Sequence, residues 1–265
     1  MDAVQYIGKN IGQSLVSSLG DVGAVFLLFA SAVKAVPAAI REKHLWFDQM
    51  VRVGIGSIPL VLVTSIFTGG VAAVQAAYQF QDYVPMRYLG TVIGKSVVIE
   101  LGPVLTALVV GGRVGASIAA ELGTMKVTEQ IDALETLAIN PIRYLVAPRL
   151  LAAVIMLPVI TIFADFLALM GGWIVALVGL KVSTHTFFSG LRLFFHPSDI
   201  YSGLIKAVFF GAIIATMGCF HGMRTEGGAE GVGIATMRAV VSSCLLILIT
   251  DYVLASLLFR TVLMR

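Results

Sequence analysis

The sequence predicts an all-α membrane protein from three observations. Only 12% of the 265 residues are charged and 58% are hydrophobic, whereas a soluble domain carries about 25% charged residues. Five apolar segments reach the roughly 20 residues that a membrane-spanning helix needs. None of them alternates apolar and polar residues as a membrane β-barrel strand does. We therefore expect a single domain over residues 1–265, with an N-terminal interfacial amphipathic helix, five transmembrane helices and a cytoplasmic helix between spans 2 and 3.

The N-terminal region, residues 1–46, is predicted to lie along the membrane surface. Apolar residues recur there at three- and four-residue steps, which is typical of an amphipathic helix: Val4, Ile7, Ile11, Leu15 and Leu19. Residues 22–33 are apolar for only about 12 positions before Lys34, which is short for a span. We expect residues 4–40 to form a helix in the interface. The alternative is an extra span that carries Lys34.

The five apolar segments that follow are predicted to be the spans, and their ends are approximate: 53–78, 93–119, 150–178, 202–221 and 239–260. Lys and Arg gather on the cytoplasmic side of a membrane protein. Eleven of the 18 basic residues fall on one side of these spans and seven on the other. This bias places the connection at 125–139 in the cytoplasm and the C-terminus outside.

Small residues repeat every four positions in two of the spans. They are Gly111, Gly115, Ala119 and Gly123 in span 2, and Gly203, Ala207, Gly211 and Ala215 in span 4. Such stripes allow helix backbones to approach closely in lipid. Packing within the chain and a seam between two copies both fit the pattern.

Of the charged residues within the predicted spans, four are candidates for a functional role, because a charge is costly in lipid. Glu100 and Lys206 have similar depths near the outer ends of spans 2 and 4, so we expect an ion pair or a shared polar network. This pair would either fix the helix register or contact a lipid head group at the mouth of a cavity. Asp165 and Asp251 lie near the middles of spans 3 and 5. A helix–helix hydrogen bond or a proton relay would explain each of them.

An acidic segment at 125–139 is predicted to form a short helix outside the membrane. Its acidic residues follow Thr128, where they favour the helix dipole, and its apolar residues fall on another stripe: Glu129, Asp132 and Glu135, and Ile131, Leu134 and Leu137. We expect Asn140 and Pro141 to end the helix. It is either a solvated loop helix or a helix that docks in a groove of a separate protein, with the apolar stripe as its anchor.

Other polar residues carry weaker signals. Gln75 and Tyr78 lie near the outer end of span 1, where Tyr78 would anchor at the interface or both would line a cavity. The segment Gly90-Thr-Val-Ile-Gly94-Lys95-Ser96 has three residues between its glycines where a nucleotide-binding P-loop has four. No metal-ligand spacing and no hydrolase motif occurs. Because these motifs are missing, we expect a chain without an active site or a cofactor of its own. The net charge of +3 does not suggest that the chain binds nucleic acid.

Several short motifs follow one another along the chain: Glu100-Leu-Gly-Pro103, Gly112-Arg-Val-Gly-Ala-Ser117, Glu121-Leu-Gly123, Thr128-Glu-Gln130, Asn140-Pro141 and Pro148-Arg149. In this order they resemble the MlaE (YrbE) family, the permease subunits of ABC systems that work with MCE proteins. The resemblance covers nearly the whole chain. It departs at Ile99, where some family members carry Arg before the residue that matches Glu100.

The resemblance implies partners and roles that the residues alone do not. It implies a homodimer in the bacterial inner membrane, an ABC ATPase that binds ATP and Mg, an MCE-domain protein on the outer face, and phospholipid as the substrate. It further implies that residues 125–139 are the coupling helix that meets the ATPase, through Thr128, Glu129, Ile131, Asp132, Leu134 and Glu135.

Three functions therefore compete. The first is the permease of a lipid ABC transporter. The second is an ion-coupled secondary transporter that uses Glu100, Lys206, Asp165 and Asp251, although such folds usually show internal repeats and these five spans show none. The third is a membrane scaffold that transports nothing.

Overall fold

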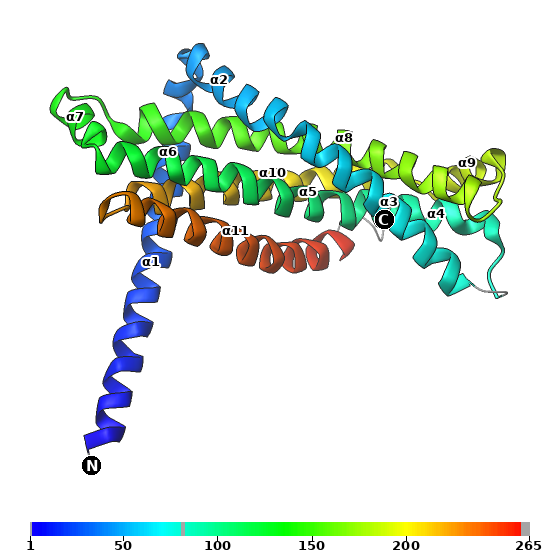
Figure 1. Ribbon diagram of the computed structural model, residues 1–265, viewed down its shortest axis with the longest axis horizontal. Helices are drawn as coiled ribbons and strands as arrows, with labels where there is room; N and C mark the ends of the chain where they lie inside the picture. Colours follow the sequence, from blue (N-terminus) through cyan, green and yellow to red (C-terminus); the bar gives the residue numbers. More distant parts are fainter. Residues whose placement is uncertain (1, 81–82, 261–265) are drawn as a thin grey trace.

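The computed structural model describes residues 2–80 and 83–260, and for residues 2–19 it describes the backbone alone. Within these ranges every regular element is a helix, which confirms the all-α prediction. Long helical runs lie side by side along one direction and form a bundle (Figure 1). A short helix closes each end of it, α7 (Gln130–Thr136) at one end and α9 (Thr184–Leu193) at the other.

Each of the five predicted spans lies in one long helical run. The runs are α2 (Lys43–Gly54), η1 (Ile55–Ser57) and α3 (Ile58–Phe80); η2 (Met86–Tyr88), α4 (Leu89–Ser96), η3 (Val97–Leu101), α5 (Gly102–Val110), η4 (Gly111–Gly115) and α6 (Ala116–Val127); η5 (Ile142–Val146) and α8 (Ala147–Val178); α10 (Pro197–Met223); and α11 (Gly228–Leu258). All five are long and apolar enough to cross a membrane.

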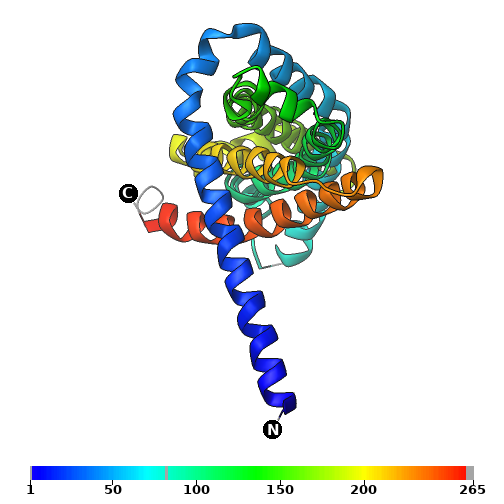
Figure 2. The same ribbon diagram turned by 90° about the vertical axis from the view of Figure 1, so that its left-hand side faces the viewer.

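The N-terminal helix α1 (Asp2–Arg41) adds a sixth candidate span, Gly20–Arg41, within the described residues. This candidate span is longer than the apolar segment predicted at 22–33, because the helix continues through Lys34 and Pro37. Figures 1 and 2 show α1 running across the bundle rather than along it. This course fits a helix in the membrane plane, and its place in the interface stays a prediction. The side chains of the amphipathic stripe at 4–19 lie outside the described residues.

Helices α3 and α8 pack backbone to backbone. A Cβ added at Gly69 would overlap the carbonyl of Ala168, and one at Gly171 would overlap the carbonyl of Ile66. Only glycine allows so close an approach, and in lipid such contact is a main source of helix association. The sequence did not single out this pair of glycines.

The two predicted small-residue stripes also pack within the chain. In span 2, Gly111 faces Ile214 and Gly123 faces Thr225. In span 4, a Cβ at Gly203 would overlap the carbonyl of Val98. The other members of both stripes are buried as well. The interpretation as intramolecular packing is therefore confirmed, and a seam between copies built from these stripes is wrong.

Candidate functional site

A buried cation ties three helices together in one half of the bundle. Lys206 on α10 is fully buried. Its Nζ donates to Glu100 Oε2 at 2.6 Å and lies 2.9 Å from Asp251 Oδ1 on α11. The first contact is a directed hydrogen bond, whereas the second is a close ion pair without hydrogen-bond alignment. The predicted pairing of Glu100 and Lys206 is thus confirmed, and Asp251 joins it.

Glu100 reaches this cation from a π-helical turn, η3. Pro103 has no backbone N–H to donate, and the turn before it is widened, with the Gly102 N–H bonded to the carbonyl of Val97 five residues back. Such π-turns are frequent at functional sites in helices. Here the turn presents a carboxylate to the neighbouring helix α10.

The cluster of Glu100, Lys206 and Asp251 opens on one side. The Glu100 side chain is 43% exposed and that of Asp251 20%, while Lys206 is closed off. A cavity of about 470 Å³ adjoins Glu100 and is lined also by Ser202, Tyr252 and Arg260. The Ser202 hydroxyl is buried there without a hydrogen-bond partner among the described residues. The cluster can therefore both fix three helices and offer a carboxylate to a polar group that enters this cavity.

Asp165 on α8 stands apart from the cluster. Its carboxylate packs against the backbone of Gly102, where a Cβ would overlap Oδ1. That oxygen has no hydrogen-bond partner among the described residues, so the predicted helix–helix hydrogen bond does not form at this atom. No ion pair of the described residues includes Asp165, so the four charges of a transmembrane relay are not assembled as one network.

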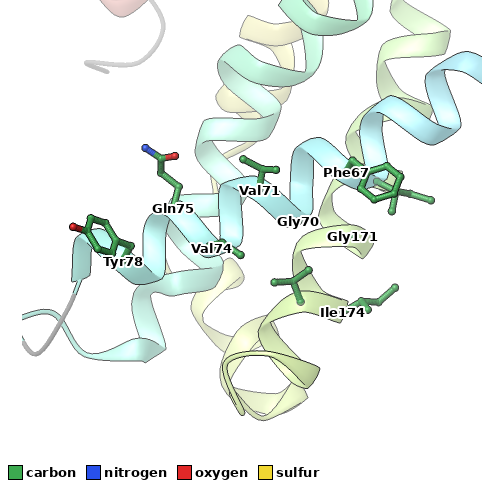
Figure 3. A pocket seen from close by; sticks show the side chains of 10 residues that line it. Phe67, Gly70, Val71, Val74, Gln75, Tyr78, Gly171 and Ile174 are labelled. Carbon is green, nitrogen blue, oxygen red and sulfur yellow. The ribbon is translucent and has the colours of Figure 1, made fainter.

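The surface of α3 that faces away from the bundle carries two apolar grooves. A cavity of about 680 Å³ between α3 and α8 is lined by Gln75 and Tyr78 together with Phe67 and Val71. Figure 3 shows Gln75 and Tyr78 projecting from neighbouring turns of α3. A second cavity of about 630 Å³ lies between α3 and α5 and shares Phe67, Val71 and Gln75. Both predicted polar residues therefore lie where they would line a cavity for an apolar ligand.

The segment predicted as one helix over 125–139 is broken in two. Helix α6 continues to Val127, and Glu129 then takes a left-handed conformation with φ of 60°. The short helix α7 follows and ends at Thr136, with Ala138 again left-handed at φ of 57°. These reversals are needed because α6 and α8 run antiparallel, and a straight 15-residue helix could not join them.

Asn140 and Pro141 begin the next helix and do not end α7, so that prediction was wrong. Asn140 Oδ1 accepts hydrogen bonds from the backbone N–H groups of Ile142, at 2.9 Å, and Arg143, at 3.4 Å. Asn is a favoured cap, and Pro is favoured in the first helical turn, where its missing N–H is not needed. Asn followed by Pro can end one helix or begin the next. In this chain the pair lies beyond the end of α7 and begins η5.

The faces of α7 also differ from the prediction. Ile131 is only 3% exposed and belongs to the core of the bundle, with Leu134 packed beside it. Ile131 and Leu134 therefore anchor α7 on its own chain, and docking of Ile131 in a partner's groove is excluded. The outward face carries Glu129 and Glu135, with Leu137 at 69% exposed.

Two further predicted residues lie on the same connection. Asp132 pairs with Lys126 at 2.7 Å. Thr128 bonds back to the carbonyl of Thr124 at 2.8 Å. Both contacts stay within the connection and fix its turn at the end of α6.

Sequence reasoning missed an arginine network where α2, α6 and α8 meet. Glu121 accepts from Arg52 at 3.2 Å through Oε1 and pairs with the buried Arg149 at 3.0 Å through Oε2. Close by, Arg113 donates hydrogen bonds to Ser57 Oγ at 3.1 Å and to the carbonyl of Arg52 at 3.3 Å. These partners are far apart along the chain, so no local spacing reveals them.

Comparison with known proteins places the chain in a family. The model of the family described as Permease MlaE matches residues 46–257. A probable ABC transporter permease protein of Rickettsia felis is 39% identical over 96% of this chain and 98% of its own length. The intermembrane phospholipid transport system permease protein MlaE of Haemophilus influenzae is 35% identical over 91% and 92%. The Arabidopsis thaliana chloroplastic protein TRIGALACTOSYLDIACYLGLYCEROL 1 is 38% identical over 86% and 66%. With its bundle of long apolar helices and these relatives, the chain is an integral membrane protein that belongs to the MlaE permease family.

Proposed function

We propose that this chain is the permease subunit of an ABC transporter that moves phospholipid or a similar lipid between membranes. Family membership and the Haemophilus relative, which is named for intermembrane phospholipid transport, support this role. The structural observation that carries it is the pair of apolar grooves on α3, because they offer long apolar surfaces with Gln75 as a polar group common to both. Acyl chains would lie along the grooves, with Gln75 and Tyr78 close to the head group.

The energy would come from a separate cytoplasmic ATPase that binds ATP and Mg. The connection at 128–139 is the part of this chain best placed to meet it. Glu129 and Glu135 are exposed there, whereas Ile131 holds α7 on the bundle. Because α7 is fixed to the core, a movement of the ATPase against its acidic face would displace α6 and α8 together with α7.

The complete transporter would contain two copies of this chain in the bacterial inner membrane and an MCE-domain protein on the outer face. Helices α3 and α11 keep long apolar faces exposed, including Phe67 and Val71 on α3 and Leu245 and Tyr252 on α11. The small-residue stripes are already used within the chain, so we place the second copy against these two faces. A cavity formed between two copies would then include the α3 grooves.

An ion-coupled secondary transporter is the alternative, and no observation favours it. It would need Asp165 to communicate with the Lys206 cluster, and Lys206 pairs with Glu100 and Asp251. We assign the cluster a structural role at the outer half of the bundle, with Glu100 turned toward the adjoining cavity.

Purification from the native membrane in mild detergent tests the proposal. An ATPase and phospholipid should copurify with the chain and be identified by mass spectrometry. Replacing the exposed acidic face of α7 should remove the ATPase while the permease stays folded. Isolation of an intact permease without any ATPase, under conditions that preserve other ABC complexes of the same membrane, would contradict it.

A further inference from the structure

A cavity of about 440 Å³ lies between α2 and α6 and is lined by Arg52, Arg113, Ser117 and Glu121. Two guanidinium groups, of Arg52 and Arg113, line the cavity. A third, of Arg149, lies behind it and contacts Glu121 from the α8 side. Only one carboxylate is present, and Glu121 uses one oxygen for Arg52 and the other for Arg149. The group therefore carries a formal charge of +2, and none of the ion pairs among the described residues includes Arg113.

Arg113 is held in place with donors to spare. Its Nη1 donates hydrogen bonds to Ser57 Oγ and to the carbonyl of Arg52. Its guanidinium packs on Gly56, where a Cβ would overlap Nη2. An arginine has five N–H donors in a fixed fork, so Nη2 and Nε keep donors for an oxyanion. The buried Nε of Arg149 also lacks a partner among the described residues, which adds to the positive potential behind the cavity.

The position of this cavity relative to the membrane indicates which anion it would meet. Helix α9 joins two candidate spans without being one, so it lies at or beyond one face of the membrane. It touches α4, in the candidate span Met86–Val127, at Thr91, whose hydroxyl donates to the carbonyl of Gly190. From Thr91 the chain is helical to Arg113, which at 1.5 Å per residue is about 33 Å. The hydrocarbon core is about 30 Å thick, so with Thr91 at the level of one face, Arg113 lies at the head-group level of the opposite leaflet.

We propose that this cavity binds a phosphate group, carried by a phospholipid of the leaflet at the α2 end. Arginine pairs with phosphate through two parallel hydrogen bonds, and the two unused positions of Arg113 provide such a fork. Arg52 lies on the other wall and would add charge. The site is separate from the α3 grooves and does not depend on the proposed transport function, since it would hold a lipid on the purified chain alone.

The test counts lipids on the intact chain in mild detergent by native mass spectrometry. The probe is dioleoyl phosphatidylglycerol, and dioleoylglycerol, with the same acyl chains and no phosphate, is the matched probe. One phosphatidylglycerol per chain should be retained and dioleoylglycerol should not. Equal retention of the two would overturn the proposal. Displacement of the lipid by millimolar inorganic phosphate would show that the site takes the free ion, and would overturn the assignment to a lipid.

Two substitutions at Ser117 separate charge from shape. Ser117 is exposed on the cavity wall, one turn from Arg113. Ser117→Glu would place a carboxylate among the arginines and compete with phosphate, so retention should fall at least about ten-fold. Ser117→Gln has the same size without the charge and should retain the lipid. Arg113→Gln should lose it as well, whereas Arg143→Gln, which removes an exposed arginine paired with Glu42, should not. Equal retention in the two Ser117 variants, with unchanged elution and thermal unfolding, would overturn the proposal.

Discussion

The ammonium of Lys206 lies 2.6 Å from the carboxylate of Glu100, although 106 positions separate the two residues in the chain. With Asp251 at 2.9 Å on its other side, this one buried cation joins η3, α10 and α11. A buried charge is tolerated only when it is paired, and removing one partner is much more costly than replacing the whole group.

This arrangement predicts unequal effects within the cluster. Lys206→Met leaves two carboxylates facing each other without a cation, and should destabilise the chain by about 3–5 kcal/mol. Glu100→Gln should cost less, because Lys206 keeps Asp251 and the Glu100 side chain is already 43% exposed. Thermal unfolding in detergent measures the order, with the exposed Lys34→Met as the control. The triple variant Lys206→Met, Glu100→Gln, Asp251→Asn should recover part of the loss, and a triple variant less stable than Lys206→Met would refute this account of the cluster.

The contact between α3 and α8 predicts a steric effect of a single methyl group. Gly69→Ala would place a Cβ into the carbonyl of Ala168, and should lower the unfolding temperature and the yield of monodisperse protein. Gly112→Ala is the matched control, since nothing lies within 4 Å of a Cβ there and alanine favours a helix over glycine. Size-exclusion chromatography after stepwise heating compares the two. Equal stability would mean that the helices are not in backbone contact.

The α3 grooves predict that bulk at one position blocks lipid without unfolding the chain. Val71 is exposed and lines both grooves. Val71→Trp should strongly reduce lipid transfer by the reconstituted complex while ATPase binding is kept. Val63→Trp, also exposed on α3 but outside both grooves, should transfer normally. Comparable transfer in both variants would remove the grooves from the lipid path.

The outward face of α7 predicts an electrostatic contact with the ATPase. Glu135→Lys reverses an exposed charge and should weaken copurification of the ATPase, with Glu135→Gln intermediate. The permease should elute and unfold as before, because Glu135 is exposed on the outward face of α7. Arg192→Glu, an exposed charge reversal on α9 at the opposite end of the bundle (Figure 1), should leave copurification unchanged. If Arg192→Glu weakens it as much as Glu135→Lys, the ATPase does not dock at α7.

The spans and the Glu100–Lys206 pair could be predicted from the sequence for a simple physical reason. Hydropathy over about 20 residues is a local property, and two opposite charges at equal depth in lipid have few other partners. The same logic did not add Asp251, whose depth along α11 depends on how that helix crosses α10. It also did not reveal the contact of Gly69 with Ala168, since the stripes that repeat every four residues drew attention to other glycines.

The connection between α6 and α8 shows where pattern reading failed. Acidic and apolar residues alternate in a helical manner through 128–137, but the pattern does not say which face meets the chain's own core. Ile131 was expected to face a partner and is buried. The chain reverses direction at Glu129 and Ala138, which both have a left-handed conformation. Neither Glu nor Ala is a residue type that favours this conformation. The arginine network around Glu121 was missed because its members come from three different helices.

The most direct test of the central claim is transfer of a fluorescent phospholipid by the chain with its copurified ATPase in proteoliposomes. Transfer should require hydrolysable ATP and Mg, and should be insensitive to a protonophore. Transfer that proceeds without ATP and follows an imposed proton gradient would contradict the account.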